Sequence, residues 1–316
     1  MRRRNPYFTA PSSILFSLFV LFGLLSLHSP ASAEKHGFVP VQKLLDLSGL
    51  VWLEDDTFLA VHDAKFPGED TLARVSLLVL PHSLAGLQWK PLRPDFPKRP
   101  SSDLESASRV PGTRDVLLVE SGDDGSSRDG IYLARVRGHD VHIVDATQWS
   151  SFAKAYNVEA TAVARTGNGL LFIWAERAQG KSSTSIRWTD LTIEPFRIGQ
   201  SKQGGQTEFA LPQELAVRYN RPLVGLDVSP DGVIYGVAAM DSDFDDGPWR
   251  SAVMRIGALA GTGVRLDAEP TVIGYIDGLK IESVALRPGK RGVEVFFGTD
   301  DENYGGTLRQ MFLDKQ

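Results

Sequence analysis

The stretch Asn157–Arg177, NVEATAVARTGNGLLFIWAER, contains two apolar runs that are joined by a Gly-Asn-Gly turn and flanked by carboxylates. Glu159 precedes the first run and Glu176 ends the second. Two apolar runs around a glycine-rich turn are typical of a β-hairpin. We therefore take the hairpin as the unit from which this chain is built.

Four further stretches repeat this pattern at intervals of roughly 54 to 65 residues. They begin at Leu47, Leu104, Leu223 and Ile281, and a strand-like segment containing an arginine follows each hairpin. Repeats of three or four strands without amphipathic helices are the signature of propeller blades. We predict an all-β fold, a β-propeller with five blades, or six if one copy has diverged. A β-sandwich whose hairpins resemble one another is the alternative.

The two ends of the chain indicate how the ring closes. The fifth copy ends short of a last strand, and the strand-like segment His36–Leu45 precedes the first copy. An N-terminal strand that completes the last blade would remove two exposed sheet edges. We therefore predict that residues 34–316 form a single propeller domain closed by an N-terminal strand.

Residues 1–33 combine three arginines, an apolar stretch from Ile14 to Leu27 and an Ala-Ser-Ala site. This order predicts a cleaved secretory signal peptide, because the apolar stretch is short for an uncleaved membrane anchor, the alternative interpretation. We expect an exported, periplasmic or extracellular protein with no membrane span after cleavage.

The composition narrows the range of partners. The 316-residue chain has a formal net charge of −5 and no cysteine. An acidic chain is poorly suited to bind nucleic acid, and a chain without cysteine forms neither disulfides nor thiolate metal sites. We expect a monomer that binds a small-molecule, glycan or peptide ligand at its acidic face.

The repeats should gather carboxylates at one mouth of the propeller channel. In a hairpin, the start of the first strand and the end of the second lie at the same end. A hard cation such as Ca²⁺, which takes six to eight oxygen ligands, would balance these charges. Solvated carboxylates, or pairs with an arginine such as Arg165 or Arg177, are the alternative. The predicted metal ligands are Glu105, Glu159 and Glu282 at strand starts, and Glu120, Glu176, Asp241 and Asp300 at strand ends.

A metal in this mouth would activate water for hydrolysis of a phosphoester or ester. His62 is the histidine that the repeat places at this end, so we predict His62 and Glu159 as catalytic residues. A histidine that makes one structural hydrogen bond is the alternative. Phe244, Trp249 and Tyr304 fall in loops at the same end and favour a non-enzymic, ligand-binding propeller of the cell envelope with a structural ion.

Three of the glutamate-led hairpins carry a resemblance to a known family. The segments DLESASRV, NVEATAVA and KIESVALRPG, with the endings VES, AER and GTDD, resemble exported propellers of the "esterase-like activity of phytase" type. The resemblance implies a propeller and metal-assisted phosphoester or ester hydrolysis. Glu105, Glu159 and Glu282 match the repeated glutamate, whereas Ser48 and Val224 depart from it, and a basic phosphate-binding cluster is not evident.

Overall fold

A computed structural model describes residues 44–63, 73–81, 86–97, 101, 103–122, 128–155 and 157–311. These residues all belong to one of the two units into which the chain divides, Lys43–His82 with Gly86–Gln316. The predicted signal peptide and most of the predicted closing strand lie outside the described residues.

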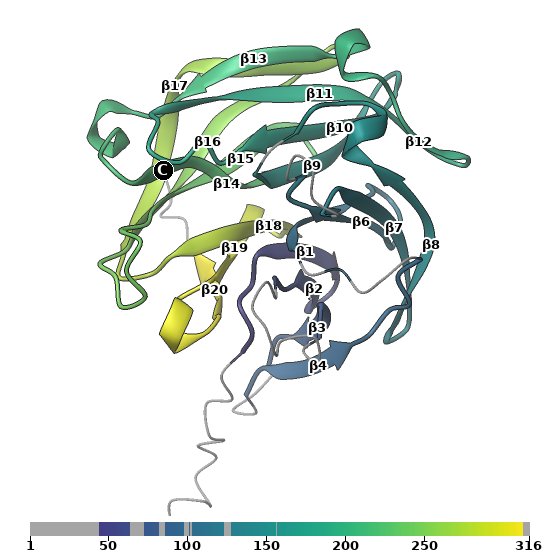
Figure 1. The fold of residues 1–316 in the computed structure, drawn as a ribbon, viewed down its shortest axis with the longest axis horizontal. Helices are drawn as coiled ribbons and strands as arrows, with labels where there is room; N and C mark the ends of the chain where they lie inside the picture. The colour runs from purple at the N-terminus through teal and green to yellow at the C-terminus, as the bar shows by residue number, and fades with distance from the viewer. Residues whose placement is uncertain are drawn as a thin grey trace, which may run out of the picture. The chain divides into compact units, whose positions relative to one another are not determined.

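The described residues form five antiparallel sheets that follow one another along the chain, with no α-helix among them (Figure 1). The first sheet contains β1 (Gly49–Glu54), β2 (Thr57–Val61), β3 (Val75–Val79) and β4 (Gln88–Leu92). The second contains β5 (Leu104–Arg109), β6 (Asp115–Glu120), β7 (Gly130–Arg137) and β8 (Asp140–Gln148). The third contains β9 (Val158–Thr166), β10 (Gly169–Glu176) and β11 (Ser183–Ile193), with β12 (Phe196–Ile198) and β13 (Gly205–Ala210) both pairing with β11. The fourth contains β14 (Asn220–Val228), β15 (Val233–Met240), β16 (Arg250–Ala260) and β17 (Gly263–Asp277), and the fifth contains β18 (Ile281–Gly289), β19 (Gly292–Thr299) and β20 (Leu308–Met311).

The first strand of each sheet lies at the centre. β1 packs against β5, β5 against β9, β9 against β14, β14 against β18, and β18 against β1. This cycle of contacts makes a closed ring of inner strands, with the later strands of each sheet farther out (Figure 1). The prediction of a five-bladed propeller is confirmed, and the sandwich is excluded.

Each interface between neighbouring sheets holds its own apolar core. The five clusters of buried side chains lie between sheets one and two, two and three, three and four, four and five, and five and one. The second of these is aromatic, because Trp149, Phe152, Phe172 and Trp174 pack with ring centroids 5.2–6.4 Å apart. Burial of apolar area at every interface, the last one included, stabilises the closed ring.

Small side chains allow the inner strands to approach closely. The hydroxyl groups of Ser106 on β5 and Thr161 on β9 are hydrogen-bonded at 2.8 Å. A Cβ atom on Gly49 of β1 would lie 2.6 Å from the backbone nitrogen of Ala107 on β5. The spacing at the ring centre therefore depends on residues with little or no side chain.

The chain before β1 joins the first blade to the last. Leu44 forms an isolated antiparallel bridge with Gly306, and the Leu47 amide donates to the Thr299 carbonyl at 3.0 Å. The buried Ser283 hydroxyl on β18 donates to the Leu47 carbonyl at 2.6 Å. These contacts tie the N-terminal part of the described chain to the three-stranded fifth sheet.

We predict that Gly49→Ala lowers the free energy of unfolding by about 1–3 kcal/mol, because the new Cβ would overpack the contact between β1 and β5. Denaturant unfolding of both proteins measures the difference. Gly167→Ala is the matched control, since nothing lies within 4 Å of a Cβ at that turn position. Equal losses in the two variants would contradict a close inner ring.

Candidate functional site

The start of each inner strand lies at the same end of the channel as the end of its hairpin partner. Leu104 pairs with Glu120, Val158 with Glu176 and Ile281 with Thr299. Asn220 pairs with Met240 in the same way. The polarity expected from the hairpins is confirmed, and we call this end the acidic mouth.

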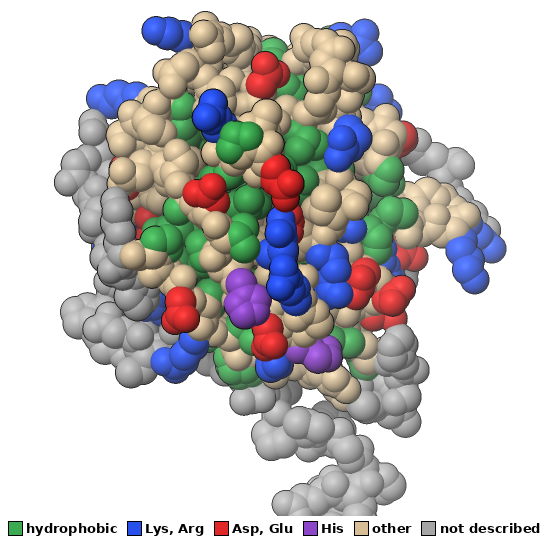
Figure 2. Space-filling model, turned by 90° about the vertical axis from the view of Figure 1, so that its right-hand side faces the viewer, with side chains coloured by type: hydrophobic (Ala, Val, Ile, Leu, Met, Phe, Trp, Pro, Cys, Tyr) green, Lys and Arg blue, Asp and Glu red, His purple; other side chains and the backbone are tan. Residues whose placement is uncertain are grey.

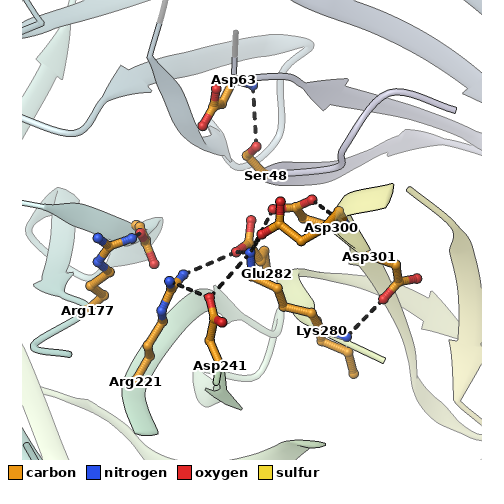
Figure 3. A network of polar contacts seen from close by, with 12 residues as sticks. Ser48, Asp63, Arg177, Arg221, Asp241, Lys280, Glu282, Asp300 and Asp301 are labelled. Atoms are coloured by element: carbon orange, nitrogen blue, oxygen red, sulfur yellow. Dashed lines mark hydrogen bonds and ion pairs between the residues drawn. The ribbon is translucent and has the colours of Figure 1, made fainter. Parts of the chain in front are cut away.

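The centre of the acidic mouth is an ion network around Arg221 on β14 (Figure 3). Its guanidinium lies 2.5 Å from the Asp241 carboxylate at the end of β15, and 3.4 Å from the Glu282 carboxylate on β18. Lys280, just before β18, lies 3.2 Å from Glu282 and 3.5 Å from Asp241. The two cations therefore bind the same two carboxylates and join the fourth blade to the fifth.

Lys280 also holds the loop that follows β19. Its ammonium lies 2.8 Å from the Asp300 carboxylate and contacts the carboxylate of Glu302. Its backbone amide donates to Asp301 at 2.9 Å. The side chain of Lys280 is only 4% exposed, so this ammonium group is a buried centre of positive charge.

The neighbouring carboxylates keep both cations charged. Burial alone would lower the pKa of Arg221, but the charges of Glu159, Glu282, Asp241 and Glu105 raise it overall. Burial likewise opposes the charge of Lys280, and the nearby carboxylates, led by Glu282, raise its pKa well above the usual value. The acidic mouth therefore contains two permanent cations that the sequence analysis did not identify.

The pKa values of Asp241 and Glu282 are shifted in opposite directions although the two residues share these cations. Arg221 and Lys280 outweigh burial at Asp241, so the pKa of that carboxyl lies below its usual value. At Glu282, burial and the charges of Asp300 and Glu159 outweigh Lys280 and Arg221, so its pKa lies well above the usual value. One carboxyl group is therefore ionised while its neighbour holds a proton more readily.

The structure brings five of the seven predicted metal ligands into or near this network. Arg177 lies 2.6 Å from Glu159, and the charges of Glu159 and Glu105 both act on Arg221. The pairing of acids with arginines, which the sequence left as an alternative, is therefore present. The five residues are Glu105, Glu159, Asp241, Glu282 and Asp300.

The other two predicted ligands serve their own sheets. Glu120 is fully buried, and it accepts hydrogen bonds from the Ser101 hydroxyl at 2.6 Å and from the Gly130 amide at 2.7 Å. Glu176 is about one-third exposed and lies 3.5 Å from Arg187 on the adjacent strand. Their contacts hold the ends of β6 and β10 rather than the centre of the mouth.

His62 follows β2 and is buried. Its Nδ1 lies 2.6 Å from the Asp46 carbonyl and its Nε2 lies 2.7 Å from the Ser76 hydroxyl. Because a carbonyl only accepts, Nδ1 carries the proton and Nε2 accepts from Ser76. Burial lowers the pKa of His62 to about 4 despite the bond to Asp46, and Arg74 adds to this effect. With both ring nitrogens engaged, the geometry matches the structural alternative and does not support a general base.

Asp46, which the sequence analysis did not single out, belongs to the segment that closes the ring. Burial, together with the charge of the Asp300 carboxylate and a hydrogen bond to it, raises the pKa of Asp46 to about 8. Two carboxyl groups in contact share one proton because both cannot be ionised together at low cost. The closing segment and the last blade therefore meet at a hydrogen-bonded pair of carboxyl groups, Asp46 and Asp300.

A second group of acids lies at the same mouth. Asp63, Asp103 and Glu105 each offer a carboxylate oxygen, and these oxygens lie within 4.8 Å of one another. Ser121 donates a hydrogen bond to Asp103, and the Arg128 guanidinium lies 3.9 Å from it. Three converging carboxylate oxygens suit a hard cation such as Ca²⁺. Among the seven predicted ligands, only Glu105 belongs to this group.

An open groove of 690 Å³ lies beside the mouth, between the fourth and fifth blades. Trp249 and Tyr304 line it with rings 6.1 Å apart and nearly perpendicular. Trp249 is buried, whereas Tyr304 is 66% exposed. Phe244, the third aromatic residue of the prediction, is 70% exposed and does not line this groove.

On the side of the molecule in Figure 2, Lys and Arg side chains lie among Asp and Glu side chains and form no broad basic area. In the described part of the chain, no helix has the length and apolar character needed to cross a membrane.

No protein-family model matches the chain, and no curated protein is significantly similar to it in sequence. Solved structures do match. A thermostable family-43 glycoside hydrolase is 10% identical over 88% of this chain and 92% of its own, with a TM-score of 0.52. An endo-1,4-beta-xylanase from Bacteroides thetaiotaomicron is 10% identical over 85% of this chain and 91% of its own, also with a TM-score of 0.52. At this identity the similarity shows the propeller fold alone, and it lends no support to the phytase-like type.

We predict that His62 makes the protein less stable as pH falls from about 6.5 to about 4. In that window the unfolded state binds a proton at His62 and the folded state does not, so the free energy of unfolding decreases by about 3 kcal/mol. Denaturant unfolding of wild type and His62→Gln across this range measures the effect as the difference between their slopes. The exposed His139→Gln serves as the control, and an unchanged slope in His62→Gln would contradict a buried neutral imidazole.

Proposed function

We propose that this protein hydrolyses glycosidic bonds at the acidic mouth, with Glu282 as the general acid and Asp241 as the ionised carboxylate. The observation that carries the proposal is a pair of carboxyl groups, Glu282 and Asp241, held by the same two cations, Arg221 and Lys280, and the opposite pKa displacements of the two acids support it. Paired carboxyl groups whose environments separate their pKa values are the usual acid and base of glycoside hydrolysis.

The proposed roles follow from the contacts of each residue. Protonated Glu282 donates its proton to the leaving glycosidic oxygen, which avoids the expulsion of an alkoxide. Asp241 stays ionised because Arg221 lies 2.5 Å away, and it stabilises the positive charge that develops on the sugar ring or orients the attacking water. Lys280 fixes the position of both carboxyl groups.

Two observations support a glycan over a phosphoester. Carboxylates outnumber cations among the described residues of the mouth, which disfavours an anionic substrate. The adjacent groove exposes the ring of Tyr304, which packs on the buried Trp249, and an exposed aromatic ring suits the apolar face of a sugar. The two glycoside hydrolases that share the fold are consistent with this substrate class. Export and a monomeric state remain predictions.

We predict that Glu282→Gln and Asp241→Asn each lower kcat by about 10²–10⁴-fold on aryl glycosides, as expected for loss of an acid–base group. The wild-type rate should fall at low pH as Asp241 protonates and at high pH as Glu282 ionises, and Glu282→Gln should lose the high-pH limb. A chromogenic panel of arabinosides, xylosides, esters and phosphate monoesters measures both effects.

Glu176→Gln is the matched control, because Glu176 lies at the same end of the channel but, among the contacts described above, pairs with the partly exposed Arg187 and not with the central cations. If the protein hydrolysed only the esters or phosphate monoesters of the panel, glycoside hydrolysis would be refuted and those compounds would be the substrate class. No turnover on any member of the panel, together with retention on an immobilised polysaccharide, would favour a non-enzymic glycan-binding propeller.

We also propose Ca²⁺ binding, now at Asp63, Asp103 and Glu105 rather than at the full ring of seven carboxylates. The donor set supports it, since three carboxylate oxygens converge within 4.8 Å. The centre of the mouth is less suitable, because Arg221 and Lys280 already form ion pairs with the carboxylates there. Such an ion would tie the first blade to the second.

We predict that Ca²⁺ raises the melting temperature of the chelated wild-type protein, since an ion that binds only the folded state stabilises it by mass action. Asp103→Asn should abolish this response, whereas Glu120→Gln, a buried acid outside the group, should retain it. Differential scanning fluorimetry with and without Ca²⁺ measures the shift. No shift in the wild type would exclude the ion.

A further inference from the structure

The end of the channel opposite the acidic mouth holds a separate cavity of 280 Å³. It lies where the hairpins of the inner strands turn, and each of the five inner strands contributes a residue to its wall. These residues are Trp52 on β1, Arg109 on β5, Arg165 on β9, Asp227 on β14 and Leu286 on β18. We call it the turn-end cavity.

Arg109 is held in a fixed orientation on the wall of this cavity. Its guanidinium carbon lies 4.8 Å from the centroid of the Trp52 ring, and its Nε donates to the Thr113 carbonyl at 2.9 Å. Within the described part of the chain, these contacts leave its two terminal nitrogens without a hydrogen bond. A guanidinium that is stacked and anchored through Nε presents a ready-made pair of donors to a planar anion.

Asp227 lies near this guanidinium and is held by backbone groups. Its carboxylate accepts hydrogen bonds from the Val228 amide at 2.7 Å and from the Leu286 amide at 2.8 Å. Burial raises its pKa to about 7, while these two bonds and the charge of Arg109 oppose the rise. Arg109 from β5 and Arg165 from β9 are the charged groups that line the cavity with it, and β18 faces it with a backbone amide.

The rest of the wall is largely apolar. Val163, Leu259 and Pro288 line the cavity together with Pro111 and Pro230. A ligand that uses the arginine donors would therefore place an apolar body against these side chains. The volume suits a molecule of about the size of a single aromatic ring with one substituent.

We propose that the turn-end cavity is a binding site for a small monocarboxylate with an apolar body, whose carboxylate is bound by the terminal nitrogens of Arg109. A dianion such as phosphate fits less well, because Asp227 adds negative charge beside the guanidinium whenever it is ionised. The same repulsion makes carboxylate binding tighter when Asp227 is protonated. The site is independent of the chemistry proposed for the acidic mouth.

Isothermal titration of the full chain with benzoate tests the proposal, with neutral benzamide as the probe that lacks the charge. Titrations run about one pH unit below and one above the pKa of Asp227. We expect saturable benzoate binding in the millimolar range that is tenfold or more tighter than benzamide binding, and stronger at the lower pH. Equal binding of the two probes, or no benzoate binding, would overturn the proposal.

Two variants and one control assign the binding to this cavity. Arg109→Gln should weaken benzoate binding at least tenfold, and Asp227→Asn should remove its pH dependence while benzoate still binds. Arg218→Gln is the matched control, because Arg218 also stacks on an aromatic ring, 4.6 Å from the centroid of Tyr219, but does not line the cavity. Unchanged benzoate affinity in folded Arg109→Gln would refute the role of the guanidinium.

Discussion

The ion pairs of Arg221 and Lys280 are the interaction on which the acidic mouth depends. Several carboxylates that converge on a buried point repel one another, and burial opposes the ionisation of each. Two cations at the starts of neighbouring blades compensate for this repulsion, with Arg221 2.5 Å from Asp241 and Lys280 2.8 Å from Asp300. At Asp241 this compensation outweighs burial and lowers the pKa, whereas at Glu282 burial and the charges of Asp300 and Glu159 outweigh it and raise the pKa. The proposed roles of Asp241 and Glu282 therefore depend on Arg221 and Lys280 as well as on the two carboxyl groups themselves.

The hairpin geometry places different chemistry at the two ends of one channel. Each inner strand begins at the acidic mouth and ends at the turn-end cavity, so the same five strands supply both walls. At the mouth, the strand starts carry Glu105, Glu159 and Glu282. At the other end, the two arginines Arg109 and Arg165 line the cavity with a single acid, Asp227. A repeated blade thus separates an acidic site from a more basic one without a second domain.

The fold was predictable from the sequence because hairpin signals are local and the repeat shows them five times. The repeated inner glutamates, Glu105, Glu159 and Glu282, were found for the same reason. Arg221 and Lys280 were missed because most of their ion pairs are with residues from other strands and loops, which only the fold brings together. The sequence feature that could have identified these two cations is a basic residue just before or at the start of an inner strand, as in NRPLV and KIESV. His62 was assigned to the right end of its strand, but its burial depends on Ser76 and Asp46, which the repeat does not specify.

The contact between Ser283 and Leu47 has a consequence for how the molecule folds. Its two residues are 236 positions apart in the chain, whereas each hairpin pairs residues that are close in sequence. Contacts of such long separation require the largest loss of chain entropy before they form, so individual blades can assemble before the ring closes. The seam between the first and last blades is then completed late in folding. Changes at this seam should act mainly on the unfolding rate, and the lifetime of the folded protein is accordingly controlled there.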